Sequence, residues 1–475
     1  MTASSPVSEQ ISQMQKVFAR QKDACRANPF PDYDSRIADL SMLKRALLTH
    51  KQALCDAMSA DYGHRSLDDS LIADILPCVL NINYTRRKLK RWMKPSRRNP
   101  GLLLHPASVS VHYQPKGVVG IIVPWNFPVM LSIGPLITAL AAGNRVMLKL
   151  SEFTPETNLA ITRMLGEIFQ PDQVAVIEGE ADVAAAFSGL PFDHLLFTGS
   201  TAVGRHVMRT AAEHLTPVTL ELGGKSPVLI DPEMPLEKAV SRLMYGKCLN
   251  AGQICVAPDY VLLPNGREKE FAEIFTRLFN RMFKKGLDSR DFSSVVNARQ
   301  YARIKALLED AREKGAEIIP VCEPAMDDAE HRLVPHLILN ATDDMNVLHE
   351  EIFGPLLPVI GYRSFDEGLS YVNEHARPLA LYLMSENPEL VGQVAKHTHS
   401  GGMTVNDTLM QVAADDAPFG GIGPSGMGHY HGVEGFRTFS HAKTVFKRGK
   451  LDPGALIHPP YGGLLHRLVM KIFMR

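Results

Sequence analysis

A carboxylate and a thiol lie near the middle of the chain, each within a few residues of glycine. Glu221 ends the apolar run Val218–Leu220 and is separated from two glycines by one leucine, and 34 positions later Cys255 closes the stretch Gly-Gln-Ile-Cys. A thiolate is a strong nucleophile, and a carboxylate beside it can serve as general base for a water molecule. An isolated cysteine is more often a small buried side chain. The two flanking motifs favour a site where the acid and the thiol meet.

An amide side chain follows a predicted strand. Asn126 lies in the stretch Pro124–Pro128, directly after the apolar run Val118–Val123. A side chain at the end of a strand can project into a crevice, where an amide can donate a hydrogen bond to a developing oxyanion. The alternative interpretation is an asparagine that only satisfies a turn.

Two further turns have the composition of a nucleotide site. Lys149 and Glu152 end the next predicted strand, where both can hydrogen-bond ribose hydroxyls and Lys149 can also tolerate a 2′-phosphate. The stretch 197–204, framed by Gly199 and Gly204, leads from a predicted strand into a helix whose N-terminus suits a pyrophosphate. The Rossmann pattern GxGxxG is absent. A solvated charged turn and a plain helix cap are the alternatives.

The elements that position these turns alternate in type. Residues 1–92 have helical periodicity. The next predicted elements are strands at 118–123, 145–149, 174–177 and 194–197 and helices at 128–142, 155–169 and 202–213. Such alternation predicts a parallel doubly wound sheet with ligands at the carboxyl ends of its strands. A second α/β pattern follows, with strands at 260–263 and 333–339, helices at 269–283, 298–314 and 367–375, and glycine-rich irregular structure at 401–446.

Composition excludes several classes of function. Lys and Arg total 51 and so do Asp and Glu, which gives no reason to expect a nucleic-acid partner. Six cysteines without a CxxC pair favour a cytoplasmic location, and His429 and His431 without a ligand cluster predict no metal site. Residues 117–144 carry no charge, but prolines interrupt them, so no membrane span is expected. Residues 1–15 lack the apolar core of a signal peptide.

Three separated motifs resemble the NAD(P)-dependent aldehyde dehydrogenase superfamily. They are Glu-Leu-Gly-Gly-Lys-Ser-Pro at 221–227, Gly-Gln-Ile-Cys at 252–255 and Glu-Ile-Phe-Gly-Pro at 351–355. Two more stretches, 197–221 and 429–441, are similar to the class 3 branch, and within it to the bacterial coniferyl aldehyde dehydrogenases. The resemblance covers nearly the whole chain. It implies an α/β fold with a doubly wound parallel-sheet cofactor domain, an α/β catalytic domain and a small oligomerisation arm.

The resemblance implies a role for each site residue. Cys255 is expected to be the nucleophile, Glu221 the base that activates water, and Asn126 the oxyanion donor. The expected cofactor is NAD, with NADP as the alternative. The residues expected to bind it are Trp125, Lys149, Glu152, Gly199, Ser200, Gly204, Glu351 and Phe353. Of these, Glu351 would hold the nicotinamide ribose and Phe353 would pack near the nicotinamide. Leu150 departs from the family's usual proline, which affects the shape of the loop more than its chemistry.

The implied reaction oxidises an aldehyde, coniferyl or another aromatic one, to the acid through a cysteine thiohemiacetal and a thioester. Three alternatives stay open at this point. One is an acylating, long-chain or semialdehyde-specific dehydrogenase of the same fold. The second is a thiol esterase that needs no cofactor, and the third is a non-catalytic protein.

The resemblance also divides the chain. Residues 1–92 and 117–222 are expected to form the NAD(P)-binding domain and 223–403 the catalytic domain, with an oligomerisation arm and C-terminal segment at 93–116 and 404–446 and a tail at 447–475. Class 3 kinship implies a homodimer. Residues 461–475 of the tail are basic and amphipathic. They are expected to dock on the rest of the protein or on a partner subunit, or to lie on a membrane surface.

Overall fold

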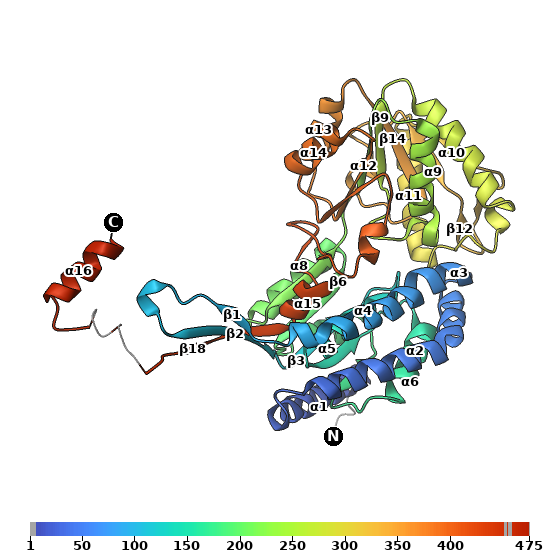
Figure 1. The fold of residues 1–475 in the computed structure, drawn as a ribbon. Helices are drawn as coiled ribbons and strands as arrows, with labels where there is room; N and C mark the ends of the chain where they lie inside the picture. The colour runs from blue at the N-terminus through green and yellow to red at the C-terminus, as the bar shows by residue number, and fades with distance from the viewer. Residues whose placement is uncertain (1–5, 451–453, 455–457, 475) are drawn as a thin grey trace.

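Two lobes and a projecting arm make up the computed structural model, which describes residues 6–450, 454 and 458–474 (Figure 1). The chain begins with four helices, as the helical periodicity predicts: α1 (Pro6–Ala27), α2 (Tyr33–Asp61), α3 (Leu67–Ser70) and α4 (Leu76–Trp92). The expected NAD(P)-binding domain includes residues 1–5, and the expected tail includes 451–453, 455–457 and 475. These residues lie outside the described part of the chain.

A six-stranded sheet forms the centre of the first lobe. Its order is β17 (Gly426–Met427), β7 (Val218–Leu222), β6 (His194–Gly199), β3 (Val118–Ile122), β4 (Arg145–Lys149) and β5 (Val174–Ile177). All pairs are parallel except β17 with β7. Side chains alternate between two cores: Val146 and Leu148 belong to the larger one, and Met147 between them belongs to the other. Burial on both faces explains why these strands have continuous apolar sequences.

Helices cross between these strands as the doubly wound prediction requires. They are α5 (Met130–Ala141), α6 (Pro155–Gly166), α7 (Ala181–Ser188) and α8 (Thr201–Ala212). The predicted α/β class and the parallel sheet are therefore confirmed.

A seven-stranded sheet forms the second lobe. Its order is β10 (Glu317–Pro320), β13 (His336–Leu339), β14 (Leu356–Tyr362), β9 (Tyr260–Pro264), β8 (Pro227–Ile230), β15 (Ala380–Met384) and β16 (Gly402–Val405). Only β10 runs antiparallel to its neighbour. The covering helices are α9 (Leu236–Cys248), α10 (Glu268–Met282), α11 (Ala298–Glu313), α13 (Phe365–Glu374) and α14 (Pro388–His397).

Two expectations about this half of the chain are wrong. The expected strand at 333–339 is broken: β12 (Arg332–Leu333) pairs with β11 (Met326–Asp327), and β13 begins only at His336, after a proline. Residues 401–446 are not irregular, because they contain β16, α15 (Gly432–Thr438) and the strand β18 (Ser440–Lys447). Glycine content suggested loops here, but several of these glycines lie where packing leaves no room for a Cβ.

The arm is a three-stranded antiparallel sheet that stands away from both lobes (Figure 1). The strand β2 (Ser108–Pro115) lies between β1 (Ser96–Arg98) and β18. Beyond the arm, the helix α16 (Leu464–Phe473) has no buried residue. Within the described residues, no helix is long and apolar enough to cross a membrane.

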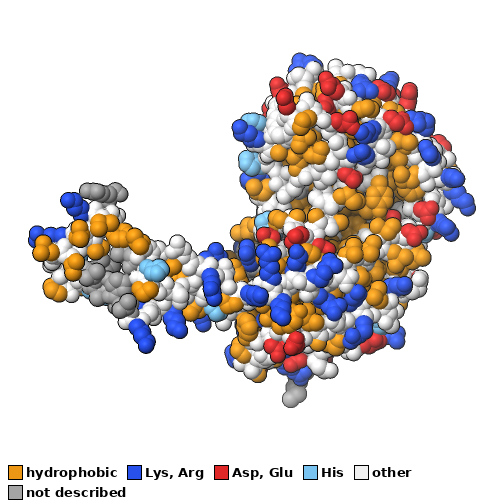
Figure 2. All heavy atoms as spheres, viewed as in Figure 1, with side chains coloured by type: hydrophobic (Ala, Val, Ile, Leu, Met, Phe, Trp, Pro, Cys, Tyr) orange, Lys and Arg blue, Asp and Glu red, His pale blue; other side chains and the backbone are white. Residues whose placement is uncertain are grey.

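A short segment connects a strand of the first large sheet to a strand of the second. The chain leaves β7 at Leu222 and enters β8 at Pro227, so only four residues join the lobes there. The carboxyl ends of β3, β4, β6 and β7 therefore carry the first group of predicted site residues. The segments just before β9 and β14 carry Cys255 and Glu351. Figure 2 shows a hollow lined with hydrophobic side chains between the lobes.

Candidate active site

The loop after β3 is held by three side chains from two other segments. The backbone carbonyl of Asn126 accepts hydrogen bonds from the Tyr62 hydroxyl (3.2 Å), Arg65 Nη1 (3.0 Å) and Asn250 Nδ2 (3.1 Å). Arg65 is fully buried and pairs with the buried carboxylate of Asp74 (2.6 Å). The position of Asn126 is thus fixed before any ligand arrives.

The side chain of Asn126 points at the segment that carries the thiol. Its Nδ2 donates to the carbonyl of Gln253 (3.1 Å), two residues before Cys255. Gln253 has no exposed surface, and its own amide donates to the carbonyls of Asn250 (2.9 Å) and Ser294 (3.0 Å). The Gly-Gln pair of the sequence motif therefore serves to fix the loop beside Asn126.

Cys255 follows a tight backbone turn. Asn250, Ala251 and Gly252 have positive φ angles of 49°, 52° and 74°. A Cβ on Gly252 would lie 2.6 Å from the carbonyl oxygen of Gly354, which explains the glycine. After the thiol, the Tyr382 hydroxyl donates to the carbonyl of Val256 (2.5 Å). Cys255 itself is only partly buried, so a ligand can reach it.

The predicted acid and thiol do come together. Burial raises the pKa of the Cys255 thiol to about 12, and the charges of Glu351 and Glu221 add to the increase. Burial also raises the pKa of Glu221 well above its ordinary value, and neither of its carboxyl oxygens has a hydrogen-bond partner. The raised pKa values favour the protonated thiol of Cys255 and the neutral carboxyl group of Glu221.

The 351–355 motif lies against the turn that follows β7. A Cβ on Gly223 would lie 2.0 Å from Glu351 Oε2, so only glycine lets this carboxyl group approach the turn after β7. Burial and, next, the charge of Asp259 raise the pKa of Glu351 to about 8. The Phe353 ring, at a positive φ of 48°, lies edge-on to Trp125 with 5.2 Å between ring centroids. Phe353 thus packs on Trp125, while the charge of Glu351 acts on Cys255.

Lys225, which the motif includes, has a supporting role in this structure. Its ammonium donates to Asp259 Oδ2 (2.6 Å) and to the carbonyls of Val347 (2.8 Å) and Glu350 (2.9 Å). Asp259 in turn accepts from the backbone N–H of Ile352 (3.2 Å). These bonds tie the 351–355 motif to the turn after β7.

The remaining predicted cofactor residues lie along the same edge of the first sheet. Lys149 is buried, donates to the carbonyl of Leu150 (2.6 Å) and lies 4.0 Å from a carboxyl oxygen of Glu152. Ser200 caps α8 at the carboxyl end of β6, between Gly199 and the buried Gly204. A Cβ on Gly204 would lie 2.6 Å from the Leu222 side chain, so this glycine lets α8 pack closely on β7.

These residues fit a dinucleotide. A helix N-terminus at the end of a parallel strand suits a pyrophosphate. Lys149 and Glu152 can contact a ribose, and Glu351 keeps one buried oxygen, Oε1, without a partner. The Thr198 hydroxyl, at the end of β6, is also buried without a partner.

Sequence reasoning missed two neighbouring buried groups, Tyr430 and His431, of which Tyr430 lies near Glu221. The Tyr430 hydroxyl and both ring nitrogens of His431 have no hydrogen-bond partner. Burial lowers the pKa of His431 to about 4. The stretch 429–441, which is similar to the class 3 branch, contains both residues. Two histidines without further ligands predict no metal site, so the sequence assigns no role to Tyr430 or His431. The described residues contain no group of three His, Cys, Asp or Glu placed to hold a metal ion.

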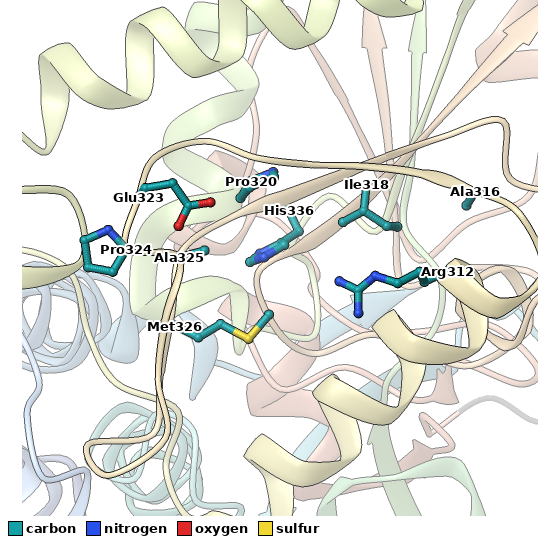
Figure 3. A pocket seen from close by; sticks show the side chains of 9 residues that line it. All are labelled: Arg312, Ala316, Ile318, Pro320, Glu323, Pro324, Ala325, Met326 and His336. Atoms are coloured by element: carbon teal, nitrogen blue, oxygen red, sulfur yellow. The ribbon is translucent and has the colours of Figure 1, made fainter.

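A second hollow lies apart from these residues, beside the edge strand β10 (Figure 3). Arg312 and Glu323 line it from opposite sides, with His336 between them. None of the predicted site residues borders it.

Comparison with known proteins accounts for this arrangement. The model of the aldehyde dehydrogenase family matches residues 8–445. This chain belongs to the aldehyde dehydrogenase family. It is 52% identical to a probable coniferyl aldehyde dehydrogenase of Pseudomonas aeruginosa, an alignment that covers 98% of each chain. It is 36% identical to aldehyde dehydrogenase family 3 member H1 of Arabidopsis thaliana, over 90% of this chain and 88% of that one.

A solved structure extends the comparison to the cofactor. A Mycobacterium tuberculosis aldehyde dehydrogenase complexed with NAD+ superposes with a TM-score of 0.81 at 27% identity, covering 90% of this chain and 88% of that one. The family, the fold and NAD(P)-dependent aldehyde oxidation, all expected from the motifs, are confirmed. The chain is an enzyme, so the non-catalytic alternative is dropped.

Proposed function

We propose that Cys255, Glu221 and Asn126 carry out aldehyde oxidation in two stages. The observation that carries the proposal is the convergence of a reachable thiol, an unpaired buried carboxyl group and a fixed amide at the junction of the two sheets. These three residues provide a nucleophile, a base and an oxyanion donor, which are the groups that the two stages need.

In the first stage the Cys255 thiolate adds to the aldehyde carbon and forms a thiohemiacetal. The Asn126 amide and the backbone N–H of Cys255 donate to the developing oxyanion. The thiolate needs help to form, because its pKa in this structure is about 12. A positive charge nearby, such as that of an oxidised nicotinamide ring, favours the thiolate. NAD, when bound, would supply the acceptor for the hydride that leaves the thiohemiacetal carbon, and the product on Cys255 would be a thioester.

In the second stage Glu221 takes a proton from a water molecule, which attacks the thioester carbon. The C–S bond breaks, the carboxylic acid leaves, and Cys255 is restored. An acid at position 221 favours hydrolysis over transfer of the acyl group to coenzyme A. The acylating alternative predicts a lower rate when coenzyme A is left out.

We further propose an aromatic substrate, with coniferyl aldehyde as the first candidate. The support is the relative at 52% identity whose name is probable coniferyl aldehyde dehydrogenase. Trp125 and Phe353 provide aromatic faces beside the thiol loop. Long-chain and semialdehyde substrates stay as alternatives for the assay.

The deciding experiment measures reduction of NAD and NADP by near-ultraviolet absorbance with coniferyl aldehyde, benzaldehyde and a long-chain aliphatic aldehyde. The wild type is expected to reduce nucleotide, and Cys255→Ser is expected to lose activity by a factor of at least about 10³. Cys248→Ser serves as control, because Cys248 is buried on α9 and has no predicted role. Ester hydrolysis without nucleotide, in the absence of aldehyde oxidation, would instead support the thiol esterase.

We propose NAD rather than NADP as the preferred cofactor. Three acids, Glu152, Glu178 and Glu180, surround the buried ammonium of Lys149. Their negative charge would repel the 2′-phosphate of NADP more than the free hydroxyl of NAD. The variant Glu152→Gln is expected to raise the ratio of kcat/KM for NADP to kcat/KM for NAD several-fold, which steady-state kinetics can measure.

We propose residues 1–92 and 117–222 as the NAD(P)-binding domain and 223–403 as the catalytic domain. Most strands of each large sheet fall in one of these domains, but β17 of the first sheet lies at 426–427 and β16 of the second extends to 405. The six cysteines are all free, in keeping with the cytoplasmic location that we propose.

We propose a homodimer in which a second copy covers the arm and α16. Seven of the eight residues of β18 are exposed, including Val445 and Phe446. The helix α16 also exposes an apolar face: Leu464, Leu465, Leu468, Ile472 and Phe473. Sedimentation of the full chain should give the mass of a dimer, and truncation after residue 447 should weaken it. A monomer that binds anionic vesicles through α16 would support the membrane alternative.

A further inference from the structure

Tyr430 lies beside the proposed base, and its hydroxyl has nothing to bind. The side chain is only 1% exposed, and the hydroxyl has no hydrogen-bond partner. A buried donor without an acceptor lowers stability, so such groups are rare unless a ligand or a reaction step uses them.

The ring cannot easily turn away to find another partner. The backbone carbonyl of Tyr430 accepts from the Thr138 hydroxyl (3.0 Å), and its oxygen lies 2.1 Å from where a Cβ on Gly435 would be. The ring edge is 3.6 Å from the Cβ position of Gly134 on α5, and it meets the Phe419 ring edge to face at 6.3 Å. These contacts restrict the backbone at Tyr430 and limit the movement of its ring.

Three titratable groups from other elements face this hydroxyl. They are Glu221 on β7, Cys255 on the thiol loop and Cys78 on α4. The neighbouring His431 ring packs edge-on against Tyr430 at 4.4 Å. The chain leading to Tyr430 also runs past the carboxyl group: Gly426 pairs with Glu221, and a Cβ on Gly420 would lie 3.2 Å from Glu221 Oε1 and 3.1 Å from His429 Cδ2.

Glu221 and Tyr430 each lack what the other offers. The carboxyl group is buried with no donor to either oxygen, and the hydroxyl is buried with no acceptor. Hydrogen bonds to a charged group are roughly twice as strong as those between neutral groups. When Glu221 ionises to accept a proton from water, a donor is needed most.

We propose that the Tyr430 hydroxyl donates a hydrogen bond to the ionised carboxylate of Glu221 during thioester hydrolysis. Tyr430 keeps its proton throughout, so no group is transferred and the balance of the hydrolysis step is unchanged. Tyr430 is in this sense a positioning residue that acts through Glu221. The inference rests on the proposed role of Glu221 as base.

The test separates the two stages of the reaction in the full-length enzyme. Tyr430→Phe removes the hydroxyl and keeps the ring. Rapid mixing with aldehyde and NAD should show a first turnover of NADH at the wild-type rate. The steady-state rate should then fall about tenfold at neutral pH, with its acid limb moved upward by about one pH unit. Incorporation of 3-fluorotyrosine at 430, which makes the hydroxyl more acidic and a stronger donor, should move the limb downward.

Two control variants distinguish a failure of the role proposed for Tyr430 from a failure of Glu221 as base. Glu221→Gln should lose hydrolysis at every pH while keeping the first turnover; normal hydrolysis in that variant would overturn Glu221 as base. Tyr362→Phe removes a buried hydroxyl that donates to the carbonyl of Ile230 (2.5 Å) away from the site. It should leave the pH profile unchanged.

Two results would overturn the role of Tyr430. A slower first turnover in Tyr430→Phe would mean that the hydroxyl serves the thiol and not Glu221. An unchanged pH profile with a normal steady-state rate would mean that it serves neither. Thermal unfolding of each variant shows that the comparison is made between folded enzymes.

Discussion

The two sides of the thiol are built differently. On the Asn126 side, one carbonyl accepts three side-chain donors and the amide of Gln253 is bonded at both ends, so only single atoms such as Asn250 Oδ1 lack partners. On the Glu221 side, whole groups lack them: both oxygens of Glu221, the Tyr430 hydroxyl and both ring nitrogens of His431.

The difference matches the demands of the two stages. An oxyanion donor works best when it is fixed in advance, because no reorganisation is then needed as charge develops. A general base must instead change its charge and admit water. The Glu221 side therefore carries polar groups whose partners arrive with the reaction, at a cost in stability. Four predictions test this contrast.

The largest effect is expected on the fixed side, from Arg65→Met. The change leaves Asp74 buried without its partner, which should lower the free energy of unfolding by about 3–5 kcal/mol. Chemical denaturation can measure this loss. The exposed pair Arg267–Glu270 provides a matched control, since Arg267→Met should cost less than about 1 kcal/mol. Equal losses at the two sites would show that burial of the pair is not what matters.

The next effect is kinetic. Asn126→Ala removes the proposed oxyanion donor and should slow the first turnover of NADH by about 10²–10³. Hydrolysis of a preformed thioester also passes through an oxyanion, so both stages should slow. A variant that slowed only hydrolysis would move Asn126 to the role proposed for Glu221.

On the other side, His431→Phe should change how stability depends on pH. The native pKa of His431 is about 4, below its ordinary 6.5, so between these values the unfolded chain binds a proton that the native chain does not. Wild-type stability therefore falls as pH drops from 6.5 to 4. The variant should avoid about 2 kcal/mol of this loss at pH 5. Parallel stability curves for the two proteins would contradict the prediction.

The smallest change in stability is expected from Glu221→Gln. The native pKa of Glu221 is raised above 4.5, so as pH rises past that value the unfolded chain loses a proton that the native chain keeps, and wild-type stability falls. The neutral amide avoids this loss and should gain about 0.5–2 kcal/mol at neutral pH, while hydrolysis is lost. A less stable variant would mean that Glu221 is already ionised and bonded in the native protein.

Much of the fold could be predicted from the sequence. Apolar runs predicted strands at Arg145–Lys149 and Val174–Ile177 with the bounds that the structure has, because a strand buried on both faces has apolar side chains on both. The strands β14 and β15 were missed, and 401–446 was wrongly expected to be irregular. In that region glycines are required by close packing between distant segments, which no local pattern records.

The sequence by itself determined the family and the types of reactive groups, because short motifs with fixed order specify which atoms are available for chemistry. Only the tertiary structure decided which of them meet. The thiol and Glu221 are brought together by two sheets joined through residues 223–226, and Tyr430 reaches the same place from the C-terminal region through β17. Burial then sets their pKa values, and burial depends on everything packed around a group rather than on its neighbours in the chain.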